Sequence, residues 1–252
     1  MVGIYLSGTG NTKHCMEKLV SLLEPGAKTV PLESMEAVQE IEVNEMILLG
    51  YPVQFSNCPY MVRKFITENS SLWKGKKILC MATMGAFSGD GAGCSARLLR
   101  KYGAVILGGL HIRMPDSVCD HKALKKPLEE NRKIIAAADR KIEKTAKQIQ
   151  NGRYPREGLN IFNRIAGLCA QRLWFYGKTN KYSDELKISN ACTGCGLCAR
   201  QCPMENLEIQ GGKALPKGQC TMCYRCISQC PQKAITLLGK KVYEQCRYEK
   251  YV

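Results

Sequence analysis

Eight cysteines in the last quarter of the chain repeat one spacing twice. Residues 192–203 read CTGCGLCARQCP, and residues 220–231 read CTMCYRCISQCP. In each copy three cysteines stand at Cys-x2-Cys-x2-Cys spacing, a fourth follows after three more residues, and a proline comes next. Three thiolates so spaced wrap around one corner of an iron–sulfur cube, while the fourth points away from it. The repeat therefore predicts two [4Fe–4S] clusters.

The fourth cysteine of each copy is expected to ligate the cluster of the other copy. The first cluster would then be held by Cys192, Cys195, Cys198 and Cys230, and the second by Cys220, Cys223, Cys226 and Cys202. Two zinc sites are the alternative, but zinc ribbons use paired Cys-x2-Cys knuckles and not triplets with a trailing Cys-Pro. Residues 186–240 resemble the two-cluster [4Fe–4S] ferredoxin family at every ligand position. No ligand spacing is found for the remaining cysteines, which are Cys15, Cys58, Cys80, Cys94, Cys119, Cys169 and Cys246.

A second candidate site lies near the N-terminus, where residues 6–13 read LSGTGNTK directly after an apolar run. Hydroxyl and amide side chains alternate there with glycines, and a helix is expected to begin at Asn11. Backbone N–H groups at a helix N-terminus favour a phosphate. The P-loop signature and the dinucleotide fingerprint Gly-x-Gly-x2-Gly are both absent. An ordinary strand-to-helix turn with an N-cap is the alternative.

The Ser-x-Thr-Gly-x-Thr pattern at residues 7–12 resembles the phosphate loop of flavodoxins, which bind FMN at this place in a doubly wound sheet. The resemblance implies phosphate contacts from Ser7, Thr9, Gly10, Asn11 and Thr12. Two later loops, residues 50–59 and 82–93, would flank the isoalloxazine ring. The ring contacts so implied are Pro52, Val53, Phe55, Thr83, Met84, Gly85, Phe87 and Gly89. Flavodoxins often carry Trp and Tyr on the flavin faces, whereas the aromatic candidates here are Phe55 and Phe87.

Short apolar runs alternate with amphipathic segments over the first 150 residues. Strands are expected at 2–6, 27–32, 45–50, 76–83 and 104–112, and helices at 11–23, 60–68, 93–103 and 125–149. This alternation favours an α/β fold with helices on both faces of a parallel sheet. We therefore expect a flavodoxin-like, doubly wound, five-stranded parallel sheet, followed by a small α+β bacterial-ferredoxin-like domain.

The chain divides into three segments: an FMN-binding domain at 1–150, a helical connector at 151–185, and a two-cluster ferredoxin domain with a C-terminal tail at 186–252. Asn151-Gly152, Pro155 and Gly158 mark the start of the connector. Its apolar residues recur at helical spacing, at Leu159, Phe162, Ala166, Cys169, Leu173 and Tyr176. We expect this helix to pack between the two domains. A helix lying on a membrane surface is the alternative.

The composition is that of an ordinary globular protein, with 15 cysteines and a formal net charge of +15. So many thiols without a disulfide framework indicate a reducing compartment, and the cytoplasm is expected. No signal peptide or run long enough to span a bilayer is seen. No nucleic-acid-binding motif accompanies the positive charge, so nucleic acid is not expected as a partner. Bound clusters and a flavin phosphate would lower the charge, leaving a basic surface suited to an acidic redox protein as donor or acceptor.

The whole chain resembles the flavodoxin-domain/ferredoxin fusion proteins of anaerobic bacteria. The resemblance implies an electron-transfer protein that passes low-potential electrons between two [4Fe–4S] clusters and FMN. Such a chain links one-electron and two-electron carriers. A flavin-dependent reductase of a small organic substrate, fed by the clusters, is the second hypothesis, and an oxygen-sensing regulatory module is the third. NADH and NADPH are not expected as direct donors, because no second nucleotide-binding fingerprint is present.

Overall fold

The computed structural model describes residues 1–175, 177 and 182–252. Its N-terminal part is built on one sheet of parallel strands in the order β2-β1-β3-β4-β5. The strands are β1 (Val2–Tyr5), β2 (Thr29–Pro31), β3 (Met46–Pro52), β4 (Lys77–Met84) and β5 (Val105–Arg113). The strand order reverses direction between β1 and β3, where doubly wound sheets form a ligand crevice. The predicted five-stranded, doubly wound parallel sheet is confirmed.

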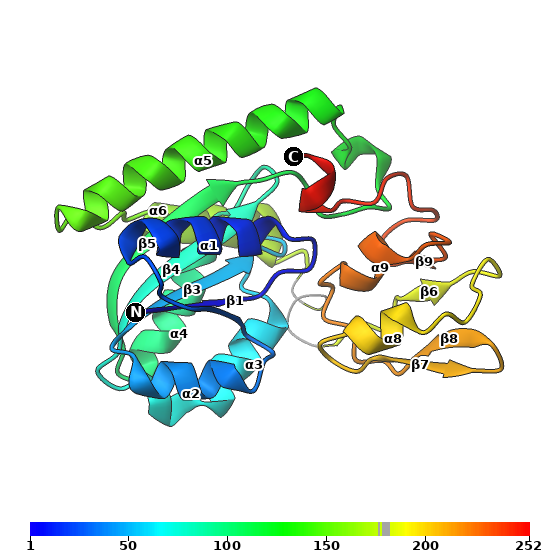
Figure 1. Cartoon of the computed structure of the whole chain (residues 1–252), viewed down its shortest axis with the longest axis horizontal. Helices are drawn as coiled ribbons and strands as arrows, with labels where there is room; N and C mark the ends of the chain where they lie inside the picture. The colour runs from blue at the N-terminus through cyan, green and yellow to red at the C-terminus, as the bar shows by residue number, and fades with distance from the viewer. Residues whose placement is uncertain (176, 178–181) are drawn as a thin grey trace.

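Helices cover both faces of this sheet (Figure 1). The helices α1 (Asn11–Leu23) and α5 (Leu128–Gln150) pack on one face, together with strand residues such as Leu48. The helices α2 (Glu36–Val43), α3 (Tyr60–Glu68) and α4 (Gly91–Lys101) pack on the other face, with residues such as Leu49. Neighbouring strand residues thus enter opposite cores, because successive side chains of a strand point to opposite faces. The apolar runs of β3 and β4 are unbroken because both faces of the sheet are buried.

The expected helices and strands of this part are found with small shifts of their ends. The long basic helix begins at Leu128, after Pro127, and not at residue 125, because proline is tolerated before the first helical turn but not within it. The helix α2 was not expected from the sequence. Short 3-10 turns are also present, at η1 (Ser70–Trp73), η2 (Lys122–Leu124) and η4 (Tyr248–Lys250).

The C-terminal part is a small α+β unit, as predicted. Its antiparallel pairs are β6 (Lys187–Ile188) with β9 (Ile235–Thr236), and β7 (Leu207–Gln210) with β8 (Lys213–Pro216). Its helices are α8 (Leu197–Gln201) and α9 (Arg225–Gln229), one from each cysteine repeat. Both helices are five residues long and end at a cysteine followed by proline. A small apolar core that includes Leu207, Ile227 and Ile235 joins the two halves.

The connector differs from the expectation. It contains α6 (Ile161–Gly167) and a π-helical turn, η3 (Leu168–Arg172). The apolar stripe does not pack between two domains, because Phe162 is 77% and Leu173 62% exposed, and Tyr176 lies outside the described residues. The connector contacts the first domain through the backbone of Gly167, which lies against Asp90, and through the side chains of Gln171 and Arg172, which bond to Ser56.

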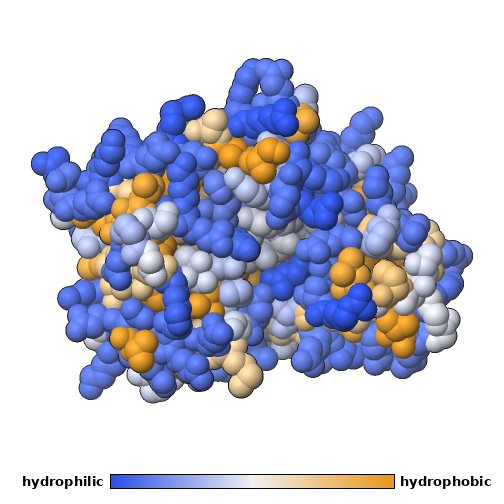
Figure 2. Space-filling view, viewed as in Figure 1, coloured by the Kyte–Doolittle hydropathy of each residue, from blue (hydrophilic) through white to orange (hydrophobic). Residues whose placement is uncertain are grey.

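The C-terminal tail returns to the first domain and ends beside α1 and α5 (Figure 1). The Tyr248 N–H donates to the Thr9 carbonyl at 2.8 Å, and the Tyr248 ring stacks on His14 with centroids 4.3 Å apart. The face shown in Figure 2 is mainly hydrophilic, with separate apolar patches. Within the described part of the chain, no helix has the length and apolar character needed to cross a membrane.

Candidate functional site: two thiol cavities and a cavity at the sheet edge

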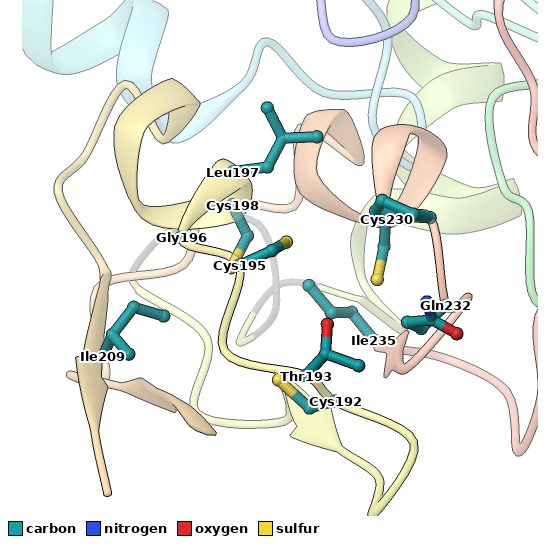
Figure 3. Close-up of a pocket in the computed structure, with 11 residues that line it drawn as sticks. Cys192, Thr193, Cys195, Gly196, Leu197, Cys198, Ile209, Cys230, Gln232 and Ile235 are labelled. Carbon is teal, nitrogen blue, oxygen red and sulfur yellow. The ribbon is translucent and has the colours of Figure 1, made fainter. Parts of the chain in front are cut away.

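Four predicted cluster ligands surround a cavity between α8 and α9, which we call the first thiol cavity. Its cysteines are Cys192, Cys195, Cys198 and Cys230. Figure 3 shows that the first three come from the loop and helix of one repeat, whereas Cys230 comes from the end of α9. The apolar residues Leu197, Ile209 and Ile235 also line this cavity.

The other four cysteines surround the second thiol cavity, which is lined by Cys202, Cys220, Cys223 and Cys226. Each cavity thus takes three cysteines from one repeat and the fourth from the other. No three His, Cys, Asp or Glu side chains among the described residues are grouped closely enough to hold a single metal ion. The donor set of each cavity, four thiols spread around an apolar space, fits a [4Fe–4S] cluster better than one zinc ion.

Backbone N–H groups point at several of these sulfur atoms. The Asn206 N–H donates to Cys202 Sγ at 3.3 Å, and the Ala234 N–H donates to Cys230 Sγ at 3.4 Å, at equivalent places in the two repeats. Such bonds stabilise thiolates and help to set the reduction potential of a bound cluster. Burial acts in the opposite direction and raises the pKa of Cys220 to about 12. A positively charged iron core would offset that cost.

One repeat uses a glycine where the other uses a tyrosine. The residue before α8 is Gly196, at φ 73°, and the residue before α9 is Tyr224, at φ 61°. A large side chain in the left-handed region is strained and needs other contacts to hold it there. The Tyr224 hydroxyl supplies one, since it donates to Asp120 Oδ1 at 2.9 Å, and Asp120 Oδ2 accepts the N–H groups of residues 237–239. This contact ties the second repeat to the first domain.

A third cavity, of about 260 Å³, lies at the carboxyl edge of the sheet, and we call it the sheet-edge cavity. Most of the residues that the sequence predicted for FMN line it: Ser7, Thr9, Asn11, Thr12, Pro52, Val53, Phe55, Thr83, Met84, Gly85 and Phe87. Gly10 and Gly89 do not line this cavity. A side chain at Gly10 would meet Tyr248, and one at Gly89 would meet Gly167, so these glycines permit contacts with the tail and the connector.

The phosphate loop has the features of an anion site. The helix α1 has no side-chain cap, because Gly10 occupies the N-cap position at φ 91°. Ser7 lines the cavity, and its Oγ is a buried hydroxyl without a hydrogen-bond partner among the described residues. Uncapped N–H groups and an unpartnered hydroxyl beside one cavity fit a phosphate. By contrast, Thr12 Oγ1 is bonded to Thr83 Oγ1 at 2.8 Å, and Thr9 Oγ1 to Ser117 Oγ at 2.9 Å.

Several residues of the sheet-edge cavity were missed by the sequence analysis. The rule that ligands bind at the carboxyl ends of strands could have found the segment after β5, which contributes Met114, Pro115, Asp116, Ser117 and Val118. Burial raises the pKa of the Asp116 carboxyl. Gly8, Gln54 and Ala86 also line the cavity and lie in the three loops that the sequence had already indicated. The other additions are Leu124, Gln171, Met222, Cys223, Tyr224 and Leu238. No sequence signal identifies the members from the connector and the second repeat, because only the packing of distant segments brings them here.

Together with its neighbour Tyr224, Cys223 lines both the second thiol cavity and the sheet-edge cavity. Its carbonyl lies against Gly8, where any Cβ would overlap it. The Arg225 guanidinium forms an ion pair with Glu33 and donates to the Ser7 carbonyl at 3.0 Å. The phosphate loop and the loop of the second repeat are therefore in direct contact.

Aromatic residues close one side of the sheet-edge cavity. The Phe55 ring stacks on Phe175 of the connector, with centroids 4.0 Å apart and an interplanar angle of 14°. Phe55 lies at φ 48°, in the left-handed region, so its loop is held in an uncommon conformation. Phe87 is 46% exposed at the mouth of the cavity.

Two protein families match separate parts of the chain. Residues 3–109 match the flavodoxin domain family, and residues 191–235 match the 4Fe-4S dicluster domain family. No curated protein matches the chain.

Three similar solved structures each cover about half of the chain. The two-electron reduced flavodoxin of Megasphaera elsdenii is 28% identical over 45% of this chain and 85% of its own, with a TM-score of 0.40. The FMN-bound flavodoxin of Fusobacterium nucleatum is 18% identical over 60% of this chain and 97% of its own, with a TM-score of 0.41. The oxidised flavodoxin 2 of Bacillus cereus is 19% identical over 56% of this chain and 97% of its own, with a TM-score of 0.38.

Proposed function

Because the chain joins an N-terminal flavodoxin domain to a C-terminal 4Fe-4S dicluster domain, we propose that it transfers low-potential electrons between two [4Fe–4S] clusters and FMN within one molecule. The dicluster domain implies two clusters, and the flavodoxin domain suggests FMN. Clusters carry one electron each, and a flavin accepts one or two, so together they link one-electron and two-electron carriers. The two thiol cavities would hold the clusters, and the sheet-edge cavity would hold FMN, with its phosphate at residues 7–12.

The double position of Cys223 is the observation that carries this proposal. A ligand of the second cluster would at the same time form part of the wall of the flavin site. The first thiol cavity shares no lining residue with the sheet-edge cavity. The cofactors would therefore be arranged in the order first cluster, second cluster and FMN. The first cluster would face outward through the exposed Cys195.

The residues of the chain have separate tasks in this scheme. Ser7 and the uncapped N-terminus of α1 bind the phosphate. Arg225 holds the phosphate loop against the loop of the second cluster through Ser7 and Glu33. The stacked pair of Phe55 and Phe175 excludes water from one side of the cavity.

Rapid-mixing spectroscopy tests the proposal on the anaerobically prepared protein with both cofactors bound. The clusters are reduced by a low-potential donor, and cluster bleaching and flavin reduction are followed at several protein concentrations. We expect flavin reduction to be first order, at a rate independent of protein concentration, because donor and acceptor share one chain. A rate that rises in proportion to protein concentration would contradict intramolecular transfer.

A further inference from the structure

Two buried cysteines outside the cluster sites contact each other where the tail meets the first domain. Cys119 follows the cavity segment after β5, and Cys246 lies in the tail; their exposed fractions are 0% and 1%. The Cys246 N–H donates to Cys119 Sγ at 3.4 Å, so the backbone of one cysteine lies against the sulfur atom of the other. A further bond joins the tail to the backbone of Cys119, since the Tyr243 N–H donates to the Cys119 carbonyl at 3.0 Å.

The surroundings of the two sulfur atoms differ. The Lys125 ammonium donates to Cys246 Sγ at 2.7 Å. Cys119 Sγ lies 3.0 Å from Ser228 Oγ. The hydrogen bond with Cys119 and the charge of Lys125 lower the pKa of Cys246 to about 7, whereas the pKa of Cys119 is raised by that same hydrogen bond and by burial. One member of the pair is thus suited to be a nucleophile and the other to resolve its product.

We infer that Cys119 and Cys246 form a redox-active dithiol, which closes to a disulfide and fastens the tail to the first domain. The contact of the Cys246 backbone with the Cys119 sulfur, the burial of both residues and the lysine at Cys246 Sγ carry this inference. Of the other cysteines without a predicted cluster role, Cys15 is buried without a thiol in contact among the described residues.

The oxidant that fits this chemistry is a low-molecular-weight disulfide. The Cys246 thiolate attacks one sulfur of the oxidant, so that a mixed disulfide forms, the S–S bond of the oxidant breaks, and one thiolate leaves. Cys119 then loses its proton to the departing thiolate and attacks Cys246 Sγ, which forms the internal disulfide and releases the second thiolate. Two electrons pass from the protein to the oxidant, which becomes two thiols. Because Cys246 is buried, the reaction requires local opening of the tail.

The Cys119–Cys246 disulfide would form where the tail contacts the first domain. The tail carries Tyr248, which contacts Thr9 of the phosphate loop, and Cys119 follows Ser117 and Val118 of the sheet-edge cavity. A disulfide would suppress opening of the tail without changing the cluster ligands.

Mass spectrometry of the protein with its cofactors tests the inference directly. The protein is incubated anaerobically with bis(2-hydroxyethyl) disulfide, alkylated and digested with trypsin without reduction. Trypsin releases Cys119 in the peptide 114–122 and Cys246 in the peptide 242–247, each with a single cysteine. We expect these two peptides to be found linked, and the link to disappear after reduction. Recovery of both peptides fully alkylated would overturn the inference.

Variants and hydrogen exchange supply the controls. Cys119→Ser and Cys246→Ser should each abolish the linked peptides, whereas Cys15→Ser should leave them. Lys125→Met should slow disulfide formation about tenfold, while Lys126→Met, at the neighbouring lysine that pairs with Glu130, should not. Amides of residues 243–252 should exchange more slowly in the oxidised protein than in the reduced one. Equal exchange in the two forms would contradict the fastening of the tail.

Discussion

At the scale of single residues, the proposed phosphate site would account for the unpartnered hydroxyl of Ser7. A buried hydroxyl without a partner destabilises the folded state, so another role is needed to account for it. A hydrogen bond to the phosphate of FMN would supply that role, because bonds to charged groups are worth about 1.5–3 kcal/mol.

Ser7→Ala should therefore weaken FMN binding about 10- to 100-fold, as the loss of one bond of this strength implies. The protein without FMN should keep its stability, because the removed hydroxyl has no partner there. Fluorescence titration gives the affinity, and thermal unfolding of the apoprotein gives the stability. Ser21→Ala, which removes an exposed hydroxyl on α1, is the control. Unchanged FMN affinity in Ser7→Ala would contradict this placement of the phosphate.

The dithiol makes a pH-dependent prediction at the same scale. Cys119, Lys125 and Tyr251 face Cys246, and the pKa of Cys246 is lowered to about 7. The thiolate, not the thiol, attacks a disulfide, so the rate of formation of the Cys119–Cys246 bond should rise with pH and level off above about 7. In Lys125→Met the rise should move to higher pH, because the positive charge that favours the thiolate is gone. Linked peptides measured over time at a series of pH values give both curves.

At the scale of elements, the sequence predicted those parts that local patterns determine. Apolar runs and helical spacing identified all five strands and the helices α1, α3, α4 and α5, and the Cys repeat indicated which thiols would share a cavity. The helix α2 was missed, because it buries only Ala37 and Ile41 and so has a weak apolar periodicity. The exposed stripe of α6 was also not predicted, since periodicity indicates an apolar face but not what covers it.

Contacts between distant segments could not be predicted. Met222, Cys223 and Tyr224 belong to a cluster motif, and nothing in that motif shows that they also line the sheet-edge cavity. The pair Cys119 and Cys246 has no spacing that distinguishes it from an accidental one, because its partners meet only when the tail folds back. Both features depend on the docking of the two domains, which is a tertiary effect.

The crossed ligation, in which each repeat supplies one cysteine to the cluster of the other, can be tested with a matched pair of variants. Cys202→Ser should damage the cluster bound by the second repeat, and Cys230→Ser the cluster bound by the first, because each residue lies in the cavity of the other repeat. Electron paramagnetic resonance of the reduced proteins should then show one altered cluster in each variant, with different spectra. Flavin reduction by the clusters should slow more in Cys202→Ser, whose damaged cluster adjoins the sheet-edge cavity. Damage to the cluster of the same repeat in either variant would refute the crossed ligation.

At the scale of the whole molecule, three exposed cations lie around the first thiol cavity, where we expect the redox partner of the proposed function to dock. Arg200 donates to the Cys195 carbonyl at 3.3 Å, the backbone of Lys233 bonds to Cys230, and Lys213 lies beside Ala214, whose N–H donates to Cys192 Sγ. All three side chains are exposed, and none forms an ion pair within the part of the chain that the structure describes. An acidic redox protein would be attracted to this face and oriented with its cofactor toward the cluster.

A charge-reversed triple variant, with Arg200→Glu, Lys213→Glu and Lys233→Glu, should lower the second-order rate of electron transfer from a reduced, acidic two-iron ferredoxin about tenfold or more at low salt. The matched control reverses three cations on α5, with Arg140→Glu, Lys144→Glu and Lys147→Glu, and so changes the net charge equally at a distance from the cysteines. The difference between the variants should shrink as salt shortens the Debye length to about 8 Å at physiological ionic strength. Stopped-flow measurements at several salt concentrations supply the rates. If both variants slow transfer equally, net charge alone attracts the partner and this face has no special part in docking; if only the α5 variant does so, electrons enter elsewhere.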